Sequence, residues 1–160
     1  MRFQVREKTL DDRKWILPYM EGSWGSERIV TRNTLYDATV LPGLIAEQDH
    51  KPSGIALYNI EDGECEVVLL ESLVENAGIG SLLLDSVRRI AEIRECRRLW
   101  LITTNDNTPA IRFYQKKGFS FVAVYRNAIE ASRRLKPEIP LEGIDGIPLR
   151  DEMELELFLK

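Results

Sequence analysis

A strand–helix–strand unit in the middle of the chain constrains the fold more than any other feature. Residues 65–70 and 99–102 are dense apolar runs, and each predicts a buried strand. Two strands joined by a helix pair in parallel, so this unit predicts parallel pairing in the centre of a sheet. The intervening helix is indicated by apolar side chains at helical spacing, namely Ile79, Leu82, Leu83, Val87, Ile90 and Ile93.

Shorter elements surround this unit. Residues 3–5 alternate as in a first strand, and Thr9 can cap a following helix that we expect to pass Pro18 and end in a mobile loop at 21–26. The remaining predicted elements are strands at 44–47, 54–60, 119–125 and 153–159 and a helix over 107–118. Short turns make the early strands antiparallel neighbours. We therefore expect one domain over residues 1–160, a mixed α/β fold with a mostly antiparallel sheet and helices on both faces.

Charge and apolar patterning exclude several classes of partner. The chain has 22 Lys and Arg against 26 Asp and Glu, a formal net charge of −4, and the two signs are interspersed, which disfavours nucleic acid. No apolar run approaches the ~20 residues of a membrane span, and no secretory signal is visible, so we expect a cytoplasmic protein without a membrane partner. Cys65 and Cys96 fit ordinary buried thiols, and His50 lies in a turn that gives no support for a metal site.

Two stretches carry the chemistry. Gly78 and Gly80 stand where the central strand passes into its helix, and exposed amides at a helix N-terminus favour a phosphate. A plain tight turn explains the glycines equally well. Asn107 opens the later helix, and Tyr114 follows two turns on, roughly on the same face. Taken singly, these two residues are explained by a capping asparagine and an ordinary amphipathic tyrosine.

Together the two stretches resemble the GNAT superfamily of acetyl-CoA-dependent N-acyltransferases. Its pyrophosphate motif has Gln or Arg, then two residues, then Gly-x-Gly or Gly-x-Ala, and Gly78-Ile79-Gly80 matches the second half. The more specific match is to the superfamily's later helix, through Asn107, Ala110, Phe113, Tyr114, Gly118 and Phe119. The order of strands and helices also agrees over nearly the whole chain.

The resemblance implies an acetyl-CoA site between the fourth and fifth strands, which splay apart. Backbone groups from Leu70 to Ser72 would pair with the pantetheine, and an amide near Leu70 would stabilise charge on the thioester oxygen. The pyrophosphate would be wrapped by Glu75, Asn76, Ala77, Gly78, Ile79, Gly80 and Ser81. The pantetheine would be lined on its other side by Asn107, Ala110 and Phe113.

Glu75 departs from the pattern, because the superfamily prefers Gln or Arg there. A carboxylate beside two phosphates costs affinity unless it turns outward, so we expect backbone amides to hold the pyrophosphate. Arg112, Lys116 and Lys117 could reach an outer phosphate, although a solvated charged helix face explains them more simply.

Acetyl transfer to an amine needs a base for the ammonium and an acid for the departing thiolate. By its match to the motif, Tyr114 is the acid. Glu66, within the fourth strand, is the first candidate for the base, and Glu71 is the second. A solvent-facing or cross-strand role for Glu66, with water assisting the attack, is an equal alternative.

The acceptor pocket is expected from Trp24, Arg32 and Arg133, and an acceptor with a carboxylate or phosphate beside its amine would suit the two arginines. Acids near the C-terminal end could instead pair with the basic cluster around Arg133. The acceptor is a small molecule or a protein amine. The alternative to an enzyme is a non-catalytic acyl-CoA-binding regulatory or sensor module. A strand at 153–159 with an unpaired edge would allow a homodimer.

Overall fold

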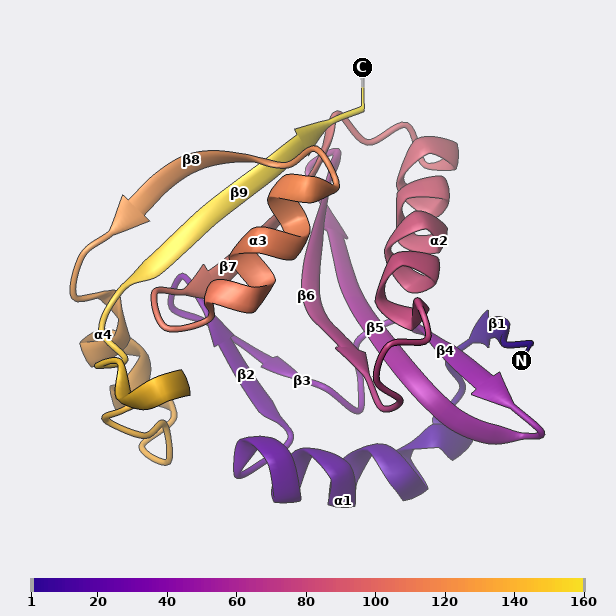
Figure 1. Ribbon diagram of the computed structural model, residues 1–160, viewed down its shortest axis with the longest axis horizontal. Coiled ribbons are helices and arrows are strands. Elements are labelled where there is room, and N and C mark those ends of the chain that lie inside the picture. Colours follow the sequence, from indigo (N-terminus) through magenta and orange to yellow (C-terminus); the bar gives the residue numbers. More distant parts are fainter. Residues whose placement is uncertain (1, 160) are drawn as a thin grey trace.

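A computed structural model describes residues 2–159 (Figure 1). Its centre is a seven-stranded sheet in the order β1-β4-β5-β6-β7-β9-β8, and β2 and β3 form a separate two-stranded sheet. The strands are β1 (Gln4–Glu7), β2 (Arg28–Thr31), β3 (Thr34–Asp37), β4 (Gly43–Gln48), β5 (Lys51–Glu61), β6 (Glu64–Ser72), β7 (Arg98–Thr104), β8 (Ser120–Tyr125) and β9 (Glu152–Phe158). The helices are η1 (Leu10–Asp12), α1 (Arg13–Trp24), α2 (Ile79–Ile93), α3 (Thr108–Lys116), α4 (Ala128–Leu135) and η2 (Ile144–Gly146).

The central parallel pair predicted from the sequence is β6 and β7. They pair only from Glu64–Arg98 to Glu66–Trp100 and then diverge, as Figure 1 shows. The neighbouring strand pairs of the sheet are antiparallel. The expected fold class is therefore confirmed, and the fourth and fifth strands of the large sheet are the ones that splay.

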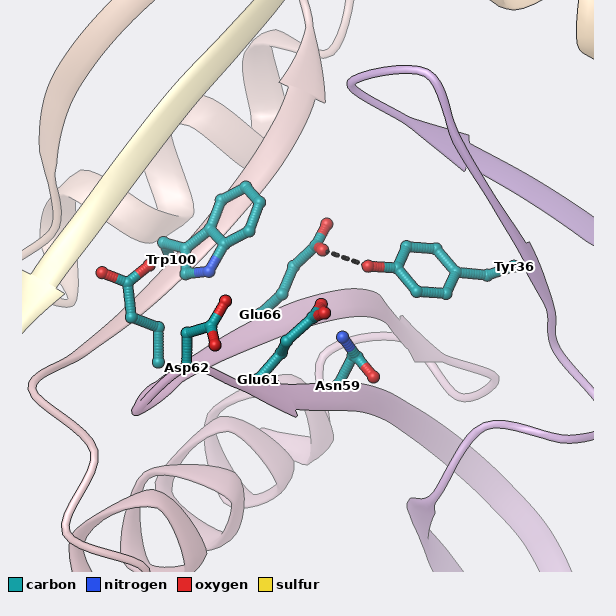
Figure 2. Close-up of a pocket in the computed structure, with 7 residues that line it drawn as sticks. Tyr36, Asn59, Glu61, Asp62, Glu66 and Trp100 are labelled. Atoms are coloured by element: carbon teal, nitrogen blue, oxygen red, sulfur yellow. Dashed lines mark hydrogen bonds between the residues drawn. The ribbon is translucent and has the colours of Figure 1, made fainter.

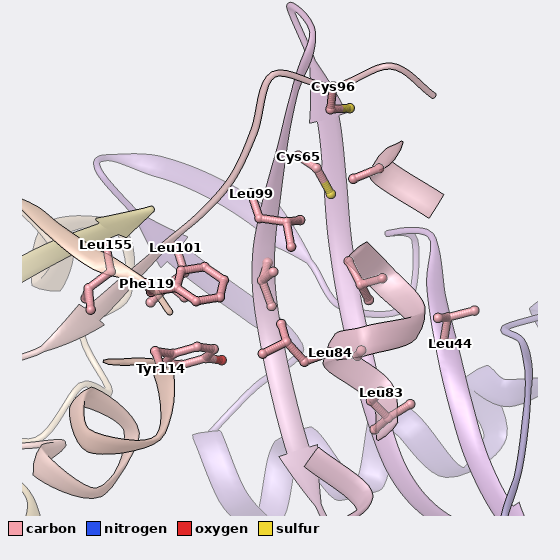
Figure 3. Close-up of a cluster of buried hydrophobic side chains, with 14 of the residues drawn as sticks. Leu44, Cys65, Leu83, Leu84, Cys96, Leu99, Leu101, Tyr114, Phe119 and Leu155 are labelled. Atoms are coloured by element: carbon pink, nitrogen blue, oxygen red, sulfur yellow. The ribbon is translucent and has the colours of Figure 1, made fainter. Parts of the chain in front are cut away.

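Two apolar clusters cover the two faces of the sheet. One lies against α2 and α3 and includes the free thiols Cys65 and Cys96 (Figure 3), which confirms the expectation of buried cysteines. The other lies against α1, through Ile16 and Met20. Helix α2 places five side chains in the first cluster, and each large apolar side chain buried there stabilises the fold by roughly 1.5–3 kcal/mol. Ile93, expected on the same face, is 78% exposed because α2 ends there.

A register shift in β6 decides which of its side chains face α1. Leu57 pairs with Leu69 and Tyr58 with Val67, so the register skips Val68. Val68 and Leu69 both enter the cluster on the α1 side, which reverses the alternation along the strand. Glu66 and Glu71 are an odd number of positions apart, and this shift brings both to the face covered by α1 and the β2–β3 sheet.

Helix α1 is longer than expected. It runs through Pro18 and Gly22 to Trp24 and ends at Gly25, whose φ of +83° is the left-handed conformation typical of a helix C-terminus. The mobile loop expected at 21–26 was therefore wrong. Burial of one apolar face of the helix outweighs the weak helix propensity of a single glycine in its last turns.

The position of β9 was also wrong. It pairs with β7 on one side and β8 on the other, so it is an interior strand and offers no free edge to a second copy. The outer strand of that half of the sheet is β8. The β2–β3 pair and α4 were not predicted. Within residues 2–159, no helix is both long enough and apolar enough to span a membrane.

Candidate active site

The divergence of β6 from β7 leaves one edge of β6 without a strand partner. Beyond Glu66 the strand pairs on its β5 side as far as Ser72, and β7 pairs instead with β9. Backbone groups on the open edge can therefore pair with an extended ligand as a neighbouring strand would. Leu70 and Ser72, the expected pantetheine contacts, lie on this stretch, and the Ser72 hydroxyl donates to the Val74 carbonyl at 2.5 Å.

The loop after β6 presents the N-terminus of α2. Asn76 and Gly78 adopt φ values of +57° and +73°, and no side chain caps the helix. Among the described residues, the amides of the first turn, at Ile79, Gly80 and Ser81, donate to no side chain or loop carbonyl. Open amides at the positive end of a 15-residue helix fit a pyrophosphate. Glu75, the departure from the family motif, is exposed on this loop, as outward orientation of its carboxylate requires.

Helix α3 brings the second sequence stretch against the first. A Cβ added at Gly80 would lie 3.6 Å from Cζ of Phe113, so the first turn of α2 and the middle of α3 are adjacent. Asn107 acts as the N-cap of α3, with its side-chain oxygen accepting from the Ala110 amide at 3.2 Å. A surface hollow of about 640 Å³ runs along this helix and is lined by Thr108, Pro109, Arg112, Phe113 and Lys116.

Tyr114 is buried at 8% exposure, between Phe113 and Phe119, with edge-on ring contacts at centroid distances of 5.2 and 5.3 Å. Burial raises the pKa of its phenol, so the hydroxyl keeps its proton. Its oxygen donates to none of the described residues, and none of their enclosed polar atoms lacks a partner, so the hydroxyl reaches open space. Figure 3 shows the hydroxyl directed away from Phe119, toward the Leu84 side of the cluster.

Glu66 lies on the opposite face of the sheet and is 2% exposed. Its two carboxylate oxygens accept from the Thr31 and Tyr36 hydroxyls, each at 2.8 Å, and both donors belong to the β2–β3 sheet. Figure 2 shows the bond from Tyr36. Desolvation is the main cause of a raised Glu66 pKa, and the two hydroxyls oppose it. A cavity of about 150 Å³ adjoins the carboxylate and is lined by Tyr36, Asn59, Glu61, Asp62, Glu64, Glu66 and Trp100.

Glu71, at the other end of the same face, contacts α1. Its carboxylate accepts from the Tyr19 hydroxyl and from Nε1 of Trp24, the latter at 2.5 Å. Burial raises its pKa to about 7. Two carboxylates of raised pKa on one face of β6 supply candidate bases for a reaction near neutral pH.

The predicted acceptor residues divide into two groups. Trp24 lies on the face of the sheet that α1 covers, where its indole donates to Glu71. Arg32 follows Thr31, whose hydroxyl contacts Glu66, but it pairs with the buried Glu152 at 3.4 Å and stacks over the Tyr125 ring at 3.5 Å from the centroid.

Arg133 contacts the backbone of the segment that follows α4. Its guanidinium donates to the carbonyls of Ile139, Pro140 and Leu149 and so holds the segment after α4. The alternative ion-pair role was wrong, because these backbone carbonyls, and no carboxylate among the described residues, accept from the guanidinium. A role at the acceptor site stays a prediction. The sequence also gave no signal for Tyr19, Thr31 or Tyr36, whose partners lie 30 to 52 residues away along the chain.

The structure thus has an open strand edge, a helix N-terminus with free amides, a phenol on one face and two carboxylates on the other. These are the parts of an acyltransferase that takes its acyl group from a coenzyme A thioester. No group of three or more potential metal ligands is found among residues 2–159.

Comparisons with known proteins give the same class. The sequence profile of the Acetyltransferase (GNAT) family matches residues 12–119. The uncharacterized protein YdhI of Bacillus subtilis (strain 168) is 43% identical over 131 residues, which cover 81% of this chain and 82% of YdhI. YxbD, an uncharacterized protein of the same strain, is 38% identical over 138 residues, 86% of this chain and 87% of YxbD.

Solved structures share the fold. An IAA acetyltransferase from Bacillus cereus superimposes with a TM-score of 0.76 at 18% identity, covering 99% of this chain and 100% of its own. A GNAT family acetyltransferase from Elizabethkingia anophelis with acetyl-CoA bound gives 0.73 at 17% identity, covering 98% of each chain. This chain belongs to the GNAT acetyltransferase family. It is an acyltransferase whose co-substrate is acetyl-CoA.

Proposed function

We propose that this protein transfers an acetyl group from acetyl-CoA directly to a primary amine. The observation that carries the proposal is the arrangement of Tyr114 and Glu66 on opposite faces of the sheet where β6 and β7 part. Tyr114 packs in one cluster with Val67 and Leu101, the residues that follow the last paired positions of the two strands. Glu66 is the last paired position of β6 and faces the other way.

This arrangement lets acid and base act on one thioester from two sides. Glu66 takes a proton from the acceptor ammonium, and the free amine then attacks the thioester carbonyl carbon. A backbone amide of β6 near Leu70 stabilises the charge that develops on the carbonyl oxygen. As the carbon–sulfur bond breaks, the Tyr114 hydroxyl, which its raised pKa keeps protonated, donates its proton to the departing thiolate. The second proton of the amine nitrogen then returns to the Tyr114 phenolate through water.

The groups that hold acetyl-CoA are backbone groups for the most part. The open edge of β6 from Leu70 to Ser72 pairs with the pantetheine. Ala110 and Phe113 of α3 line it, together with Asn107 at the N-cap. The pyrophosphate lies against the loop before α2 and the first amides of that helix. The residues of this segment are Glu75, Asn76, Ala77, Gly78, Ile79, Gly80 and Ser81. The uncapped α2 amides support this assignment.

The charges near Glu66 favour an acceptor that carries no anionic group. Arg32 pairs with Glu152, and the Arg133 guanidinium donates to backbone carbonyls, so both have fewer donors left for a carboxylate or phosphate. Around the cavity, Glu61 and Asp62 are exposed and form no ion pair among the described residues. A small-molecule amine or the amine of a protein therefore enters as a cation against an acidic rim.

Two measurements test the function. The purified protein is titrated calorimetrically with acetyl-CoA, CoA and ATP, and is then incubated with acetyl-CoA and a panel of amines with and without carboxylates while thiol release and product mass are followed. We expect selective binding of the CoA compounds and N-acetylation of amines that lack anionic groups. Binding without transfer to any amine would remove the catalytic proposal, and absence of binding would remove the assignment of the α2 loop.

No observation favours the alternative of a non-catalytic acyl-CoA sensor, because binding alone requires neither a buried carboxylate nor a phenol beside the strand gap. A cytoplasmic location and a homodimer remain predictions. If a homodimer forms, it does not use β9, whose two edges are both paired.

A further inference from the structure

The β2–β3 sheet has no counterpart in the expectations drawn from the sequence, and two of its hydroxyl groups contact Glu66. Its two strands are joined by Arg32 and Asn33, whose φ values of +46° and +64° define the tight turn that suits the twist of a hairpin. Asparagine adopts this conformation readily, whereas arginine rarely does. A non-glycine residue held there needs support from its surroundings.

That support comes from the far half of the large sheet. The Arg32 amide donates to Glu152 at 3.2 Å, its guanidinium donates to the same carboxylate at 3.4 Å, and the guanidinium lies over the Tyr125 ring. Glu152 is 2% exposed. The turn of the hairpin is therefore fixed to β8 and β9, although a short hairpin alone is marginally stable in water.

The body of the hairpin then lies over Glu66. Thr31 stands beside the turn on β2 and Tyr36 stands on β3, and each hydroxyl donates to a different carboxylate oxygen at 2.8 Å. Burial and the nearby carboxylates raise the pKa of Tyr36, so its phenol remains a donor at neutral pH. With one donor on each oxygen, the carboxylate has a fixed plane, and its remaining lone pairs are the ones available to an incoming proton.

We propose that the β2–β3 hairpin is a positioning element for Glu66, in which the hydroxyls of Thr31 and Tyr36 fix the carboxylate and favour its ionised form. The inference rests on the proposed role of Glu66 as the base. Thr31 and Tyr36 are positioning residues, since they act through Glu66.

Other groups around Glu66 also affect whether its carboxylate is ionised. Glu152 and Glu154 on β9 disfavour its ionisation, and burial does so more strongly. The two hydroxyls are the groups that oppose these effects. The remaining side chains that line the adjoining cavity come from β5, its following turn, β6 and β7, and they are Asn59, Glu61, Asp62, Glu64 and Trp100. Removing one hydroxyl therefore removes one of the two groups that favour ionisation of Glu66, while burial and the nearby carboxylates still disfavour it.

The first test needs no acceptor. Protein labelled with carbon-13 at the glutamate carboxyls is titrated by NMR, and the Glu66 resonance is assigned by its loss in Glu66→Gln. We expect Tyr36→Phe and Thr31→Val each to raise the Glu66 pKa by about one unit, which is the scale of one hydrogen bond to a charged group. Thr31→Ser, which keeps a hydroxyl, should leave the Glu66 pKa close to its wild-type value. Tyr58→Phe is the matched control, because Tyr58 packs in the cluster on the other face of the sheet.

Unchanged Glu66 titration in both Tyr36→Phe and Thr31→Val would overturn the proposal. Should one variant unfold, as judged by circular dichroism, the other decides the question, because the two hydroxyls act on different oxygens.

The second test uses whichever amine is acetylated in the panel described above. Tyr36→Phe should lower kcat/KM about tenfold on the acidic side of the pH profile and approach the wild-type value at high pH, where Glu66 is ionised in both proteins. The double variant Tyr36→Phe/Glu66→Gln should be no slower than Glu66→Gln alone. A loss that is uniform in pH, or one that adds to Glu66→Gln, would contradict positioning through Glu66. If no amine is acetylated, the proposed function fails, while the carboxyl titration still decides whether the hairpin holds Glu66.

Discussion

The two halves of the site are built in different ways. On the acetyl-CoA side, the groups we assign to the ligand are mostly backbone amides of α2 and the open edge of β6. On the acceptor side, the buried Glu66 and the half-buried Glu71 each accept from hydroxyl or indole donors of α1 or the β2–β3 hairpin. Backbone recognition can serve any member of a family that shares a co-substrate, whereas side-chain recognition can be rebuilt for each acceptor.

This contrast also explains what the sequence could predict. A backbone cradle requires particular residues at short spacing, so Gly78, Gly80 and the pattern from Asn107 to Phe119 were visible as motifs. The acceptor side depends on contacts such as Tyr36 to Glu66 and Trp24 to Glu71, which span 30 and 47 residues. The following experiments separate the two halves, beginning with the largest expected effect.

Glu66→Gln should reduce kcat by about 100- to 10,000-fold, because a neutral amide cannot take the proton of the ammonium. The acetyl-CoA dissociation constant, measured by calorimetry, should stay near the wild-type value, since the carboxylate lies on the acceptor side. Glu130→Gln, an exposed change on α4, is the control. A retained kcat in Glu66→Gln would transfer the role of base to Glu71 or to water.

Gly78→Glu should weaken acetyl-CoA binding by at least ~100-fold, because a carboxylate beside the free α2 amides competes with the pyrophosphate for charge-assisted hydrogen bonds. The φ of +73° at this position adds backbone strain. Calorimetric titration measures the effect. Gly22→Glu introduces the same charge at another glycine with open space around it, and it should bind normally. Undiminished binding by Gly78→Glu would exclude this loop from the cofactor site.

Tyr114→Phe tests the point where the two halves meet. Loss of the phenol should lower kcat about 30- to 100-fold, the scale of one hydrogen bond to a developing charge, with little change in acetyl-CoA affinity. Steady-state kinetics and calorimetry on the same preparation measure both quantities. Equal losses in turnover and affinity would instead assign the tyrosine a packing role between Phe113 and Phe119.

Glu71→Gln should change how stability depends on pH. The pKa of Glu71 is raised from 4.5 to about 7 in the folded protein. Between these values the unfolded chain has lost the proton that the folded protein still binds, so the free energy of unfolding falls as pH rises to about 7. Glutamine removes this dependence, and the variant should gain a few degrees of Tm over wild type at pH 8 and none at pH 4. Glu21→Gln, exposed on α1, is the control, and an identical gain at both pH values would refute the burial argument.

Glu75→Gln should have the smallest effect, a gain in acetyl-CoA affinity of about two- to fivefold that shrinks with added salt, as expected for an exposed charge near an anionic ligand. Calorimetry at two ionic strengths measures it. An affinity gain that is independent of salt would show that Glu75 disturbs the loop by means other than its charge.

Much of the fold was predictable because its core elements have strong periodic patterns. The α2 helix, the strands of the early meander and the parallel pair are examples. The end of α1 was misplaced because glycine and serine in its last turns suggested a loop, whereas tertiary packing of Ile16 and Met20 holds the helix together. The β2–β3 hairpin escaped notice because its strands have four residues each and its turn lacks glycine. The carbonyl partners of Arg133 were not predicted, because charge alone does not distinguish an anion from a backbone carbonyl.

The insertion of β9 between β7 and β8 has a consequence for synthesis on the ribosome. Strands β1, β4, β5 and β6 pair with one another, so this half of the sheet can assemble while translation continues. Strands β7 and β8 do not pair with each other, so β8 has no partner and β7 has only its short pairing with β6 until residues 152–158 emerge between them. The acetyl-CoA cleft therefore forms late in the life of the nascent chain, and any truncation that removes this segment would leave both strands with exposed edges open to aggregation.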